Sequence, residues 1–205
     1  MTEATIMVFG DSITYGVVDN ELGGWVNRLR LDLANREKNG SMVFNLGISG
    51  EITQETLVRF ENECNTRYDA DRNTIVVFAI GINDTKIMNG KYIVSEEQFQ
   101  RNIKDLIEKA KKFTENILFV GLTKVDETKE IPFVWDGNTS FSNERIKEFD
   151  DLLEAVCGDL QIAYIKTHSL LSANELADGL HPDGVGHQKI CDVVLKEIKK
   201  LLQKI

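Results

Sequence analysis

A serine near one end of this sequence and a histidine near the other are residue types that could carry out nucleophilic chemistry. Ser12 follows the apolar run 6–9 and lies in a Gly-Asp-Ser turn, whereas Asp178 and His181 lie together far along the chain. A serine hydroxyl is a poor nucleophile at neutral pH unless a base lies within hydrogen-bond reach. Histidine suits that role, and Asp178, three residues away, could fix its tautomer and stabilise the imidazolium. Pro182 favours the start of a helix directly after His181.

Acyl transfer also needs hydrogen-bond donors aimed at the oxyanion of the tetrahedral intermediate. The backbone amides of Ser12 and Gly47 and the side-chain amide of Asn83 could supply three such donors. A glycine at position 47 would let the backbone come close to a substrate. Ser12, Gly47 and Asn83 are therefore candidates for an oxyanion hole.

The elements that would position these groups follow from the apolar pattern. Five apolar runs predict buried strands, at residues 5–9, 42–46, 74–80, 116–122 and 161–165. Stretches with helical periodicity separate them. Continuous apolar strands that alternate with helices indicate a parallel sheet covered on both faces, which is a three-layer α/β/α sandwich. Sites in such sheets form beyond the carboxyl ends of the strands, so we expect the groups that follow strands to meet at one edge.

Length and composition place limits on the function. At 205 residues, the chain is expected to form a single domain over residues 1–205. Its net charge of -9 argues against a nucleic-acid partner, and no apolar run approaches the ~18 residues of a membrane helix. Three scattered cysteines predict buried free thiols, and the absence of an export signal predicts a cytoplasmic protein. We expect neither a cofactor nor a metal, since the chain has three histidines and no Cys/His cluster. Oligomeric state is left open.

Four segments together resemble the signature blocks of the SGNH, or GDSL-type, hydrolases. In chain order they are Gly10-Asp11-Ser12, Gly47, Gly81-x-Asn83-Asp84 and Asp178-x-x-His181-Pro182. The resemblance implies a flavodoxin-like sandwich with a five-stranded parallel sheet and a hydrolase of carboxylic esters or thioesters. It also implies Ser12 as nucleophile, His181 as base and Asp178 as the partner of the base.

Other residues offer alternative readings of the same chemistry. Ser49 is a rival nucleophile, but a turn residue that caps the next helix is the simpler interpretation. His187 falls inside a predicted helix as a packing or surface residue, and His168 lies in a loop with no aspartate at a helpful spacing. Asp11 and Asp84 could be read as an acidic metal-binding pair of a receiver-type domain, although that reading needs a second acid after the first strand.

The substrate is expected to be a small ester with a short acyl chain, such as an O-acetyl or aryl ester. The first alternative is a thioesterase or lysophospholipase that acts on longer acyl chains. The second alternative is a non-catalytic ligand-binding domain of flavodoxin-like fold. The long connection 123–140 is a candidate for shaping the pocket. The pocket candidates are Asp11, Tyr15, Trp25 and Trp135, with Ile87, Met88, Val125 and Phe133 as further apolar possibilities.

Overall fold

A five-stranded parallel sheet forms the centre of the computed structural model, which describes residues 3–34, 40–129 and 138–204. Its strands are β1 (Ala4–Gly10), β2 (Met42–Gly47), β3 (Asn73–Ala79), β6 (Ile117–Val120) and β8 (Ala163–Ile165). They lie in the order β2-β1-β3-β6-β8, and every neighbouring pair is parallel. This is the flavodoxin-like order of a doubly wound sheet. The five predicted strands and the predicted architecture are therefore confirmed.

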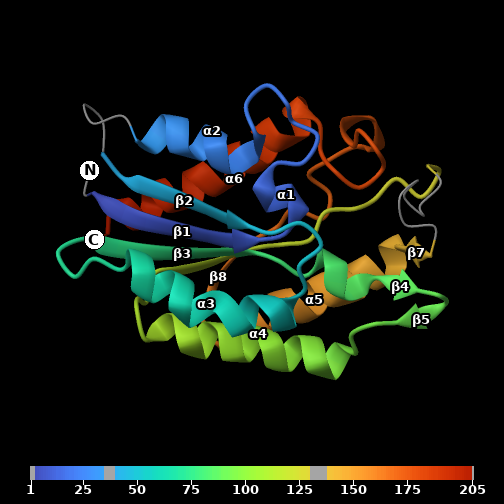
Figure 1. The fold of residues 1–205 in the computed structure, drawn as a ribbon, viewed down its shortest axis with the longest axis horizontal. Helices are drawn as coiled ribbons and strands as arrows, with labels where there is room; N and C mark the ends of the chain where they lie inside the picture. Colours follow the sequence, from blue (N-terminus) through green and yellow to red (C-terminus); the bar gives the residue numbers. More distant parts are fainter. Residues whose placement is uncertain (1–2, 35–39, 130–137, 205) are drawn as a thin grey trace.

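Helices cover both faces of this sheet (Figure 1). The longer helices are α2 (Gly24–Leu33), α3 (Thr53–Arg67), α4 (Glu96–Lys111), α5 (Asn143–Asp159) and α6 (Gly184–Leu202). Successive residues of a strand point to opposite faces, so Ile6 and Val8 of β1 pack in the core with α2 and α6. Met7 and Phe9 pack in the other core, against α3, α4 and α5. The continuous apolar runs of the inner strands β1, β3 and β6 thus arise because both of their faces are buried, whereas the edge strands β2 and β8 are partly exposed.

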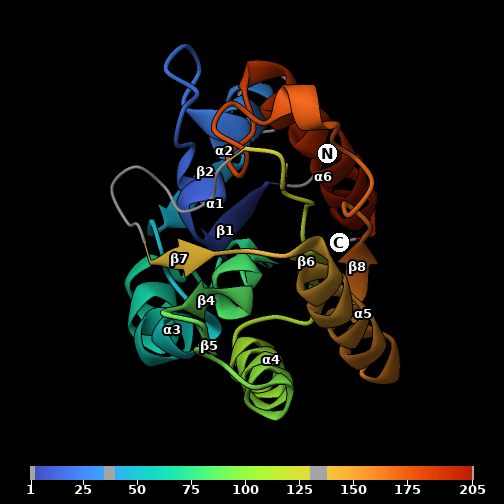
Figure 2. The same cartoon turned by 90° about the vertical axis from the view of Figure 1, so that its right-hand side faces the viewer.

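A second, smaller sheet was not predicted from the sequence. The two-residue strands β5 (Lys91–Tyr92), β4 (Ile87–Met88) and β7 (Thr139–Ser140) form an antiparallel sheet in that order. Figure 2 shows it at one end of the molecule, beside the helices of the α3–α4 side. Because β7 ends the connection 123–140, this sheet ties the described end of that connection to the segment that follows β3.

The topology creates a single edge at which the polar groups meet. The chain leaves β1 towards β2 on one side and later returns to β3 on the other side, so β1 lies at the switch point of the sheet. The register aligns Gly10 at the end of β1 with Gly47 of β2 and Ala79 of β3. The segments that follow these three strands therefore start side by side.

Within the described residues, no helix combines the length and apolar character needed to cross a lipid bilayer. Cys64, Cys157 and Cys191 are buried free thiols on α3, α5 and α6, as the sequence predicts.

Candidate active site

Ser12 lies at the start of a one-turn helix, α1 (Ser12–Tyr15), directly after β1. Asp11 caps this helix, because its carboxylate accepts a hydrogen bond from the Ile13 amide at 3.0 Å. The hydroxyl of Thr14 donates to the carbonyl of Ala79 at the end of β3, at 3.3 Å. These contacts fix the serine turn on two neighbouring strands of the sheet.

Ser12, His181 and Asp178 form a continuous chain of hydrogen bonds, although 169 residues separate the first two. His181 Nε2 lies 2.8 Å from Ser12 Oγ, and His181 Nδ1 lies 2.6 Å from Asp178 Oδ2. His181 is buried, and its backbone carbonyl accepts from the Ala177 amide at 2.9 Å. Such an arrangement allows the imidazole to take a proton from the serine hydroxyl while the carboxylate fixes its tautomer.

The environment of Asp178 keeps its carboxyl group ionised. Burial acts to raise its pKa, but the His181 ring and the amides of His181 and Leu180 donate hydrogen bonds that lower this pKa to about 2. Pro182 does not begin the next helix. Helix α6 starts at Gly184, with Asp183 as its N-cap, because the Asp183 carboxylate accepts from the Gly186 amide at 2.8 Å.

The amide of Gly47 does not point into open space, contrary to the expectation for an oxyanion-hole donor. It donates to Oδ1 of Asn45 at 3.0 Å, while Nδ2 of Asn45 donates to the carbonyl of Thr14 at 3.0 Å. A side chain at position 47 would approach the backbone nitrogen of Tyr15 to 2.4 Å. The physical reason for this glycine is therefore the close packing of α1 on β2.

Gly50 has the properties that the sequence attributed to Gly47. Its φ of 84° lies in the left-handed region, and an added Cβ would meet nothing closer than Lys86 Nζ at 3.9 Å. Neither the Gly50 amide nor the Ser12 amide has a hydrogen-bond acceptor within the described residues. Asn83 is buried, and its Nδ2 donates to the carbonyl of Glu51, the neighbour of Gly50, at 3.1 Å. The second hydrogen of that amide leaves one donor for another acceptor.

Two further carboxylates are buried close to this centre. Burial raises the pKa of Asp11 to about 6, against the hydrogen bond from the Ile13 amide. Burial also raises the pKa of Asp84 to about 7, even though Thr53 donates to this carboxylate through both its amide and its hydroxyl. No group of three His, Cys, Asp or Glu side chains in the described part of the chain could hold a metal ion. Both acids are satisfied by neighbouring backbone or hydroxyl donors instead.

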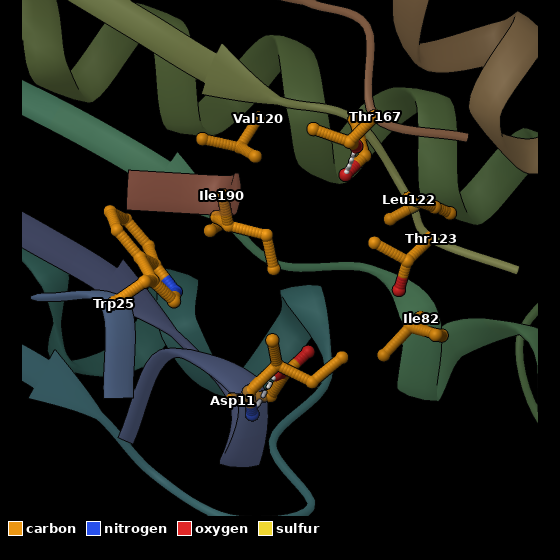
Figure 3. Close-up of a pocket in the computed structure, with 11 residues that line it drawn as sticks. Asp11, Trp25, Ile82, Val120, Leu122, Thr123, Thr167 and Ile190 are labelled. Atoms are coloured by element: carbon orange, nitrogen blue, oxygen red, sulfur yellow. Dashed lines mark hydrogen bonds between the residues drawn. The ribbon is translucent and has the colours of Figure 1, made fainter. Parts of the chain in front are cut away.

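A cavity borders the serine turn at Asp11 and Ile13, and Figure 3 shows the residues that line it. Two of the predicted pocket residues, Asp11 and Trp25, are among the residues that line it. Ser12 and His181 are not among its lining residues. Trp25 Nε1 and Thr123 Oγ1 are buried on its wall and have no hydrogen-bond partner among the described residues. The cavity therefore adjoins the nucleophile turn and offers two polar groups within a largely apolar wall.

The other pocket candidates lie elsewhere. Tyr15 is 61% exposed at the end of α1 and does not line this cavity. Ile87 and Met88 form β4, and Val125 is buried. Trp135 and Phe133 lie outside the described residues.

The rival residues have other surroundings. His187 is fully buried in α6, with Nε2 3.5 Å from the carbonyl of Val17, so it is a packing residue. His168 has no aspartate at a helpful spacing in the sequence, but the fold brings Asp150 Oδ2 to 4.0 Å from its Nδ1. Ser49 does not cap α3, since that helix has Ile52 at its N-cap.

The sequence analysis did not identify Gly50 or Glu51. The available signal was the second glycine of Gly47-x-x-Gly50, followed by the acidic Glu51. The pattern alone cannot tell which glycine amide is free, because Asn45 takes up the Gly47 amide only in the folded chain.

The chain is similar in sequence to known proteins. The sequence pattern of the GDSL-like lipase/acylhydrolase family matches residues 8–189. A multidomain esterase of Ruminococcus flavefaciens is 27% identical over 97% of this chain. The chain spans 29% of the length of that relative.

Solved structures share the fold. An α/β-hydrolase enzyme from the metagenome of Lake Arreo, Spain, superposes with a TM-score of 0.75 at 19% identity and covers 98% of each chain. A variant of an acetyl xylan esterase from Geobacillus stearothermophilus superposes with a TM-score of 0.73 at 19% identity, covering 96% of this chain and 95% of the other.

Proposed function

The chain belongs to the GDSL-like lipase/acylhydrolase family of carboxylic ester hydrolases, and on that premise we propose that it is a serine esterase for short-chain esters. The observation that carries the proposal is the chain of hydrogen bonds from Ser12 Oγ through His181 to Asp178, with distances of 2.8 and 2.6 Å. A serine, a base and an orienting acid in mutual contact are the constellation that acyl transfer requires.

In this mechanism, Ser12 Oγ attacks the ester carbonyl while His181 Nε2 takes the hydroxyl proton. His181 then protonates the leaving alkoxide, and the acyl group remains on Ser12 as an ester. Water, deprotonated by the same histidine, attacks the acyl-enzyme and releases the acid with Ser12 restored. Asp178 stays ionised throughout, in keeping with its lowered pKa.

The oxyanion in this mechanism is bound by the Ser12 amide, the Gly50 amide and Nδ2 of Asn83. Two observations support Gly50 in place of Gly47. The Gly47 amide already donates to Asn45, whereas the Gly50 amide has no acceptor in the described part of the chain. Gly50 also directly precedes the residue whose carbonyl holds Asn83.

The substrate we propose is a small ester, with O-acetyl and aryl esters as the leading classes. An esterase among the relatives and an acetyl xylan esterase among proteins of the same fold support acetylated carbohydrate as the first natural class to test. The partner of the protein would then be a small molecule. Thioesters and lysophospholipids are the competing substrates, and chain-length preference separates them.

A series of p-nitrophenyl esters from acetyl to palmitoyl tests the function, with Ser12→Ala as the control. We expect Ser12-dependent hydrolysis that falls steeply beyond butyryl. If Ser12→Ala hydrolysed the esters as fast as the wild type, Ser12 would not be the nucleophile. A rate that rises with chain length would replace the short-chain substrate by a long-chain one. Acetylated xylo-oligosaccharides then test the carbohydrate class directly.

A further inference from the structure

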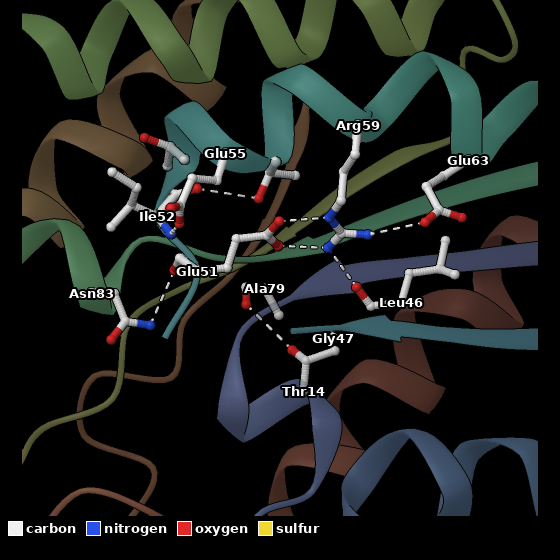
Figure 4. Close-up of polar contacts among 12 residues, drawn as sticks. Thr14, Leu46, Gly47, Glu51, Ile52, Glu55, Arg59, Glu63, Ala79 and Asn83 are labelled. Carbon is white, nitrogen blue, oxygen red and sulfur yellow. Dashed lines mark hydrogen bonds and ion pairs between the residues drawn. The ribbon is translucent and has the colours of Figure 1, made fainter. Parts of the chain in front are cut away.

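The loop between β2 and α3 is held by a buried acid that contacts the site at one end and a helix at the other. Glu51 is 4% exposed, and its backbone carbonyl accepts from Asn83 Nδ2 at 3.1 Å. Its carboxylate accepts two hydrogen bonds from Arg59 of α3, from Nε and Nη2, both at 2.5 Å. One residue thus connects the Asn83 amide to a guanidinium that lies outside the site (Figure 4).

Arg59 also holds the other end of the same loop. Its Nη2 donates to the carbonyl of Leu46, the residue before Gly47, at 2.6 Å. The guanidinium lies over the ring of Phe9 in β1, 5.4 Å from the ring centroid. Figure 4 shows this side chain reaching from α3 across the loop towards the strands. A single guanidinium therefore joins the end of β2, the Gly50–Glu51 turn and the strand that leads to Ser12.

We propose that Arg59 and Glu51 are positioning residues that set the geometry of the oxyanion hole. The proposal rests on the proposed esterase function, in which the Gly50 amide and Asn83 bind the oxyanion. Neither Arg59 nor Glu51 touches the reacting atoms. Arg59 acts through the Glu51 carboxylate. Glu51 acts on Asn83 through its carbonyl, and on the Gly50 amide through the backbone, since the Gly50–Glu51 peptide is joined at the Gly50 Cα to the peptide that carries the Gly50 N–H.

The chemistry of the pair suits this task. A guanidinium is planar and presents paired donors in a fixed fork, so two bonds to one carboxylate set the orientation as well as the distance. A lysine would supply the charge without the fork. Displacement of an oxyanion donor by ~1 Å can cost ~100-fold in rate, because the donors must lie where charge develops. A positioning role therefore predicts loss of kcat with little change in KM.

Arg59→Lys, Arg59→Gln and Glu51→Gln test the assignment, with Glu63→Gln as the matched control. Glu63 pairs with the same guanidinium at 3.8 Å, but from α3 itself and without contact to the loop. We expect kcat for p-nitrophenyl acetate to fall ~10- to 100-fold in the Arg59 variants, with KM within ~3-fold of the wild type. Glu63→Gln should retain the kcat of the wild type.

Partial unfolding is separated from mispositioning by titrating the active serine with an organophosphonate. A merely structural role lowers the number of titratable sites and leaves kcat per site unchanged, and that result would overturn the proposal. If Arg59→Gln does not fold, Glu51→Gln and Arg59→Lys carry the test, since each keeps the shape or the charge of the pair.

A double variant tests whether Arg59 acts through Glu51. We expect Glu51→Gln combined with Arg59→Gln to lose no more kcat than Arg59→Gln alone, because both remove the same contact. Full additivity would contradict the assigned route. Failure of the esterase function itself is distinguishable, since it appears as an absence of Ser12-dependent hydrolysis in the wild type.

Discussion

At the scale of single residues, the hydrogen bonds around Asp178 differ from those around Asp183, a half-buried carboxylate that caps α6. Asp178 accepts from two amides and from the His181 ring, whereas Asp183 in the same segment accepts from one helix-terminal amide. Replacement of aspartate by asparagine is therefore expected to affect activity at position 178 but not at position 183.

Asp178→Asn is expected to lower kcat by ~100- to 10,000-fold, because an amide at that position favours the wrong imidazole tautomer. Steady-state hydrolysis of p-nitrophenyl acetate measures this loss. Asp183→Asn is the control, since asparagine is an equally good N-cap and activity should be retained. Equal activity of the two variants would contradict the assigned role of Asp178.

A comparison of Gly50 with Gly90 tests whether Gly50 belongs to the proposed oxyanion hole. Both have positive φ, 84° and 72°, and an added Cβ at either has no close neighbour. Alanine should therefore cost a similar ~1 kcal/mol of stability at each position. We expect kcat to fall at least ~10-fold in Gly50→Ala alone, because the strained peptide shifts the proposed oxyanion donor. Equal kcat in both variants would remove Gly50 from the oxyanion hole.

Asp84 predicts a pH dependence of stability. Burial raises its pKa to about 7 in the folded protein, above its ordinary value of 3.8. The folded state therefore binds more protons between these values, and the contribution of Asp84 to stability falls as pH rises through that window. The free energy of unfolding of Asp84→Asn, relative to the wild type, should increase from pH 5 to 7 by up to ~1.4 kcal/mol per pH unit. Asp71→Asn, at an exposed position, is the control, and a pH-independent difference for Asp84→Asn would contradict the raised pKa.

At the scale of elements, the buried Arg28 side chain of α2 joins the loop before α2 to the start of α6, close to the histidine loop. Arg28 of α2 pairs with Asp19, and its Nη2 donates to the carbonyl of Gly184 at the start of α6, at 3.1 Å. Burial acts to raise the pKa of Asp19, but hydrogen bonds from Arg28 and from the amides of Gly24 and Leu22 lower it to about 2. This pair fixes the N-terminus of α6, three residues after His181.

Asp19→Asn is expected to lower the free energy of unfolding by ~3 kcal/mol at pH 7, since it leaves the buried Arg28 unpaired. Asp19 stabilises the fold above its ordinary pKa, and this contribution is lost as pH falls from about 4 to 2. Urea unfolding at pH 7 and pH 3 measures the difference, which should shrink at the lower pH.

Asp32→Asn provides the matched control for that experiment. Its ion pair with Lys199 joins the same two helices at 3.0 Å, but both side chains are more than a third exposed. Exposed pairs contribute ~0–1 kcal/mol, so this variant should unfold close to the wild type. An equal loss of unfolding free energy in both variants would contradict the larger contribution expected from the buried Arg28–Asp19 pair.

At the scale of the whole molecule, two cores lie on opposite faces of one sheet and share its strands. Cys64 and Cys157 are buried in the core of α3, α4 and α5, and Cys191 is buried in the core of α2 and α6. Burial raises the pKa of each thiol to about 12. The thiols therefore report separately on the two faces.

If residues 1–205 behave as a single domain, all three thiols become reactive in the same urea transition. Variants that keep one cysteine each, with the others replaced by serine or alanine, are treated with a thiol reagent across the transition. Coincident midpoints for Cys191 and Cys64 are expected. Exposure of Cys191 well before Cys64 would show that the two helical layers unfold independently.

The sequence alone determined the class of the fold and the candidate nucleophile, base and acid. The strands could be predicted because the inner strands of a sheet covered on both faces require uninterrupted apolar runs, and such runs are visible without any knowledge of pairing. Ser12, Asn83, Asp178 and His181 could be selected because each follows a strand or precedes the last helix. Their catalytic roles remain predictions that the variants above test.

Tertiary structure decided the features that depend on contacts between distant segments. The short strands of the β5-β4-β7 sheet carry no periodic signal, because two residues are too few to alternate. The Gly47 amide is not free because Asn45 Oδ1 accepts its hydrogen bond, and Asn45 is held in place by its own hydrogen bond to the Thr14 carbonyl of α1. The sequence does not reveal this contact. Arg59 meets Leu46 and Glu51 because a helix lies against the sheet, and long-range packing brings a side chain to partners that sequence spacing does not reveal.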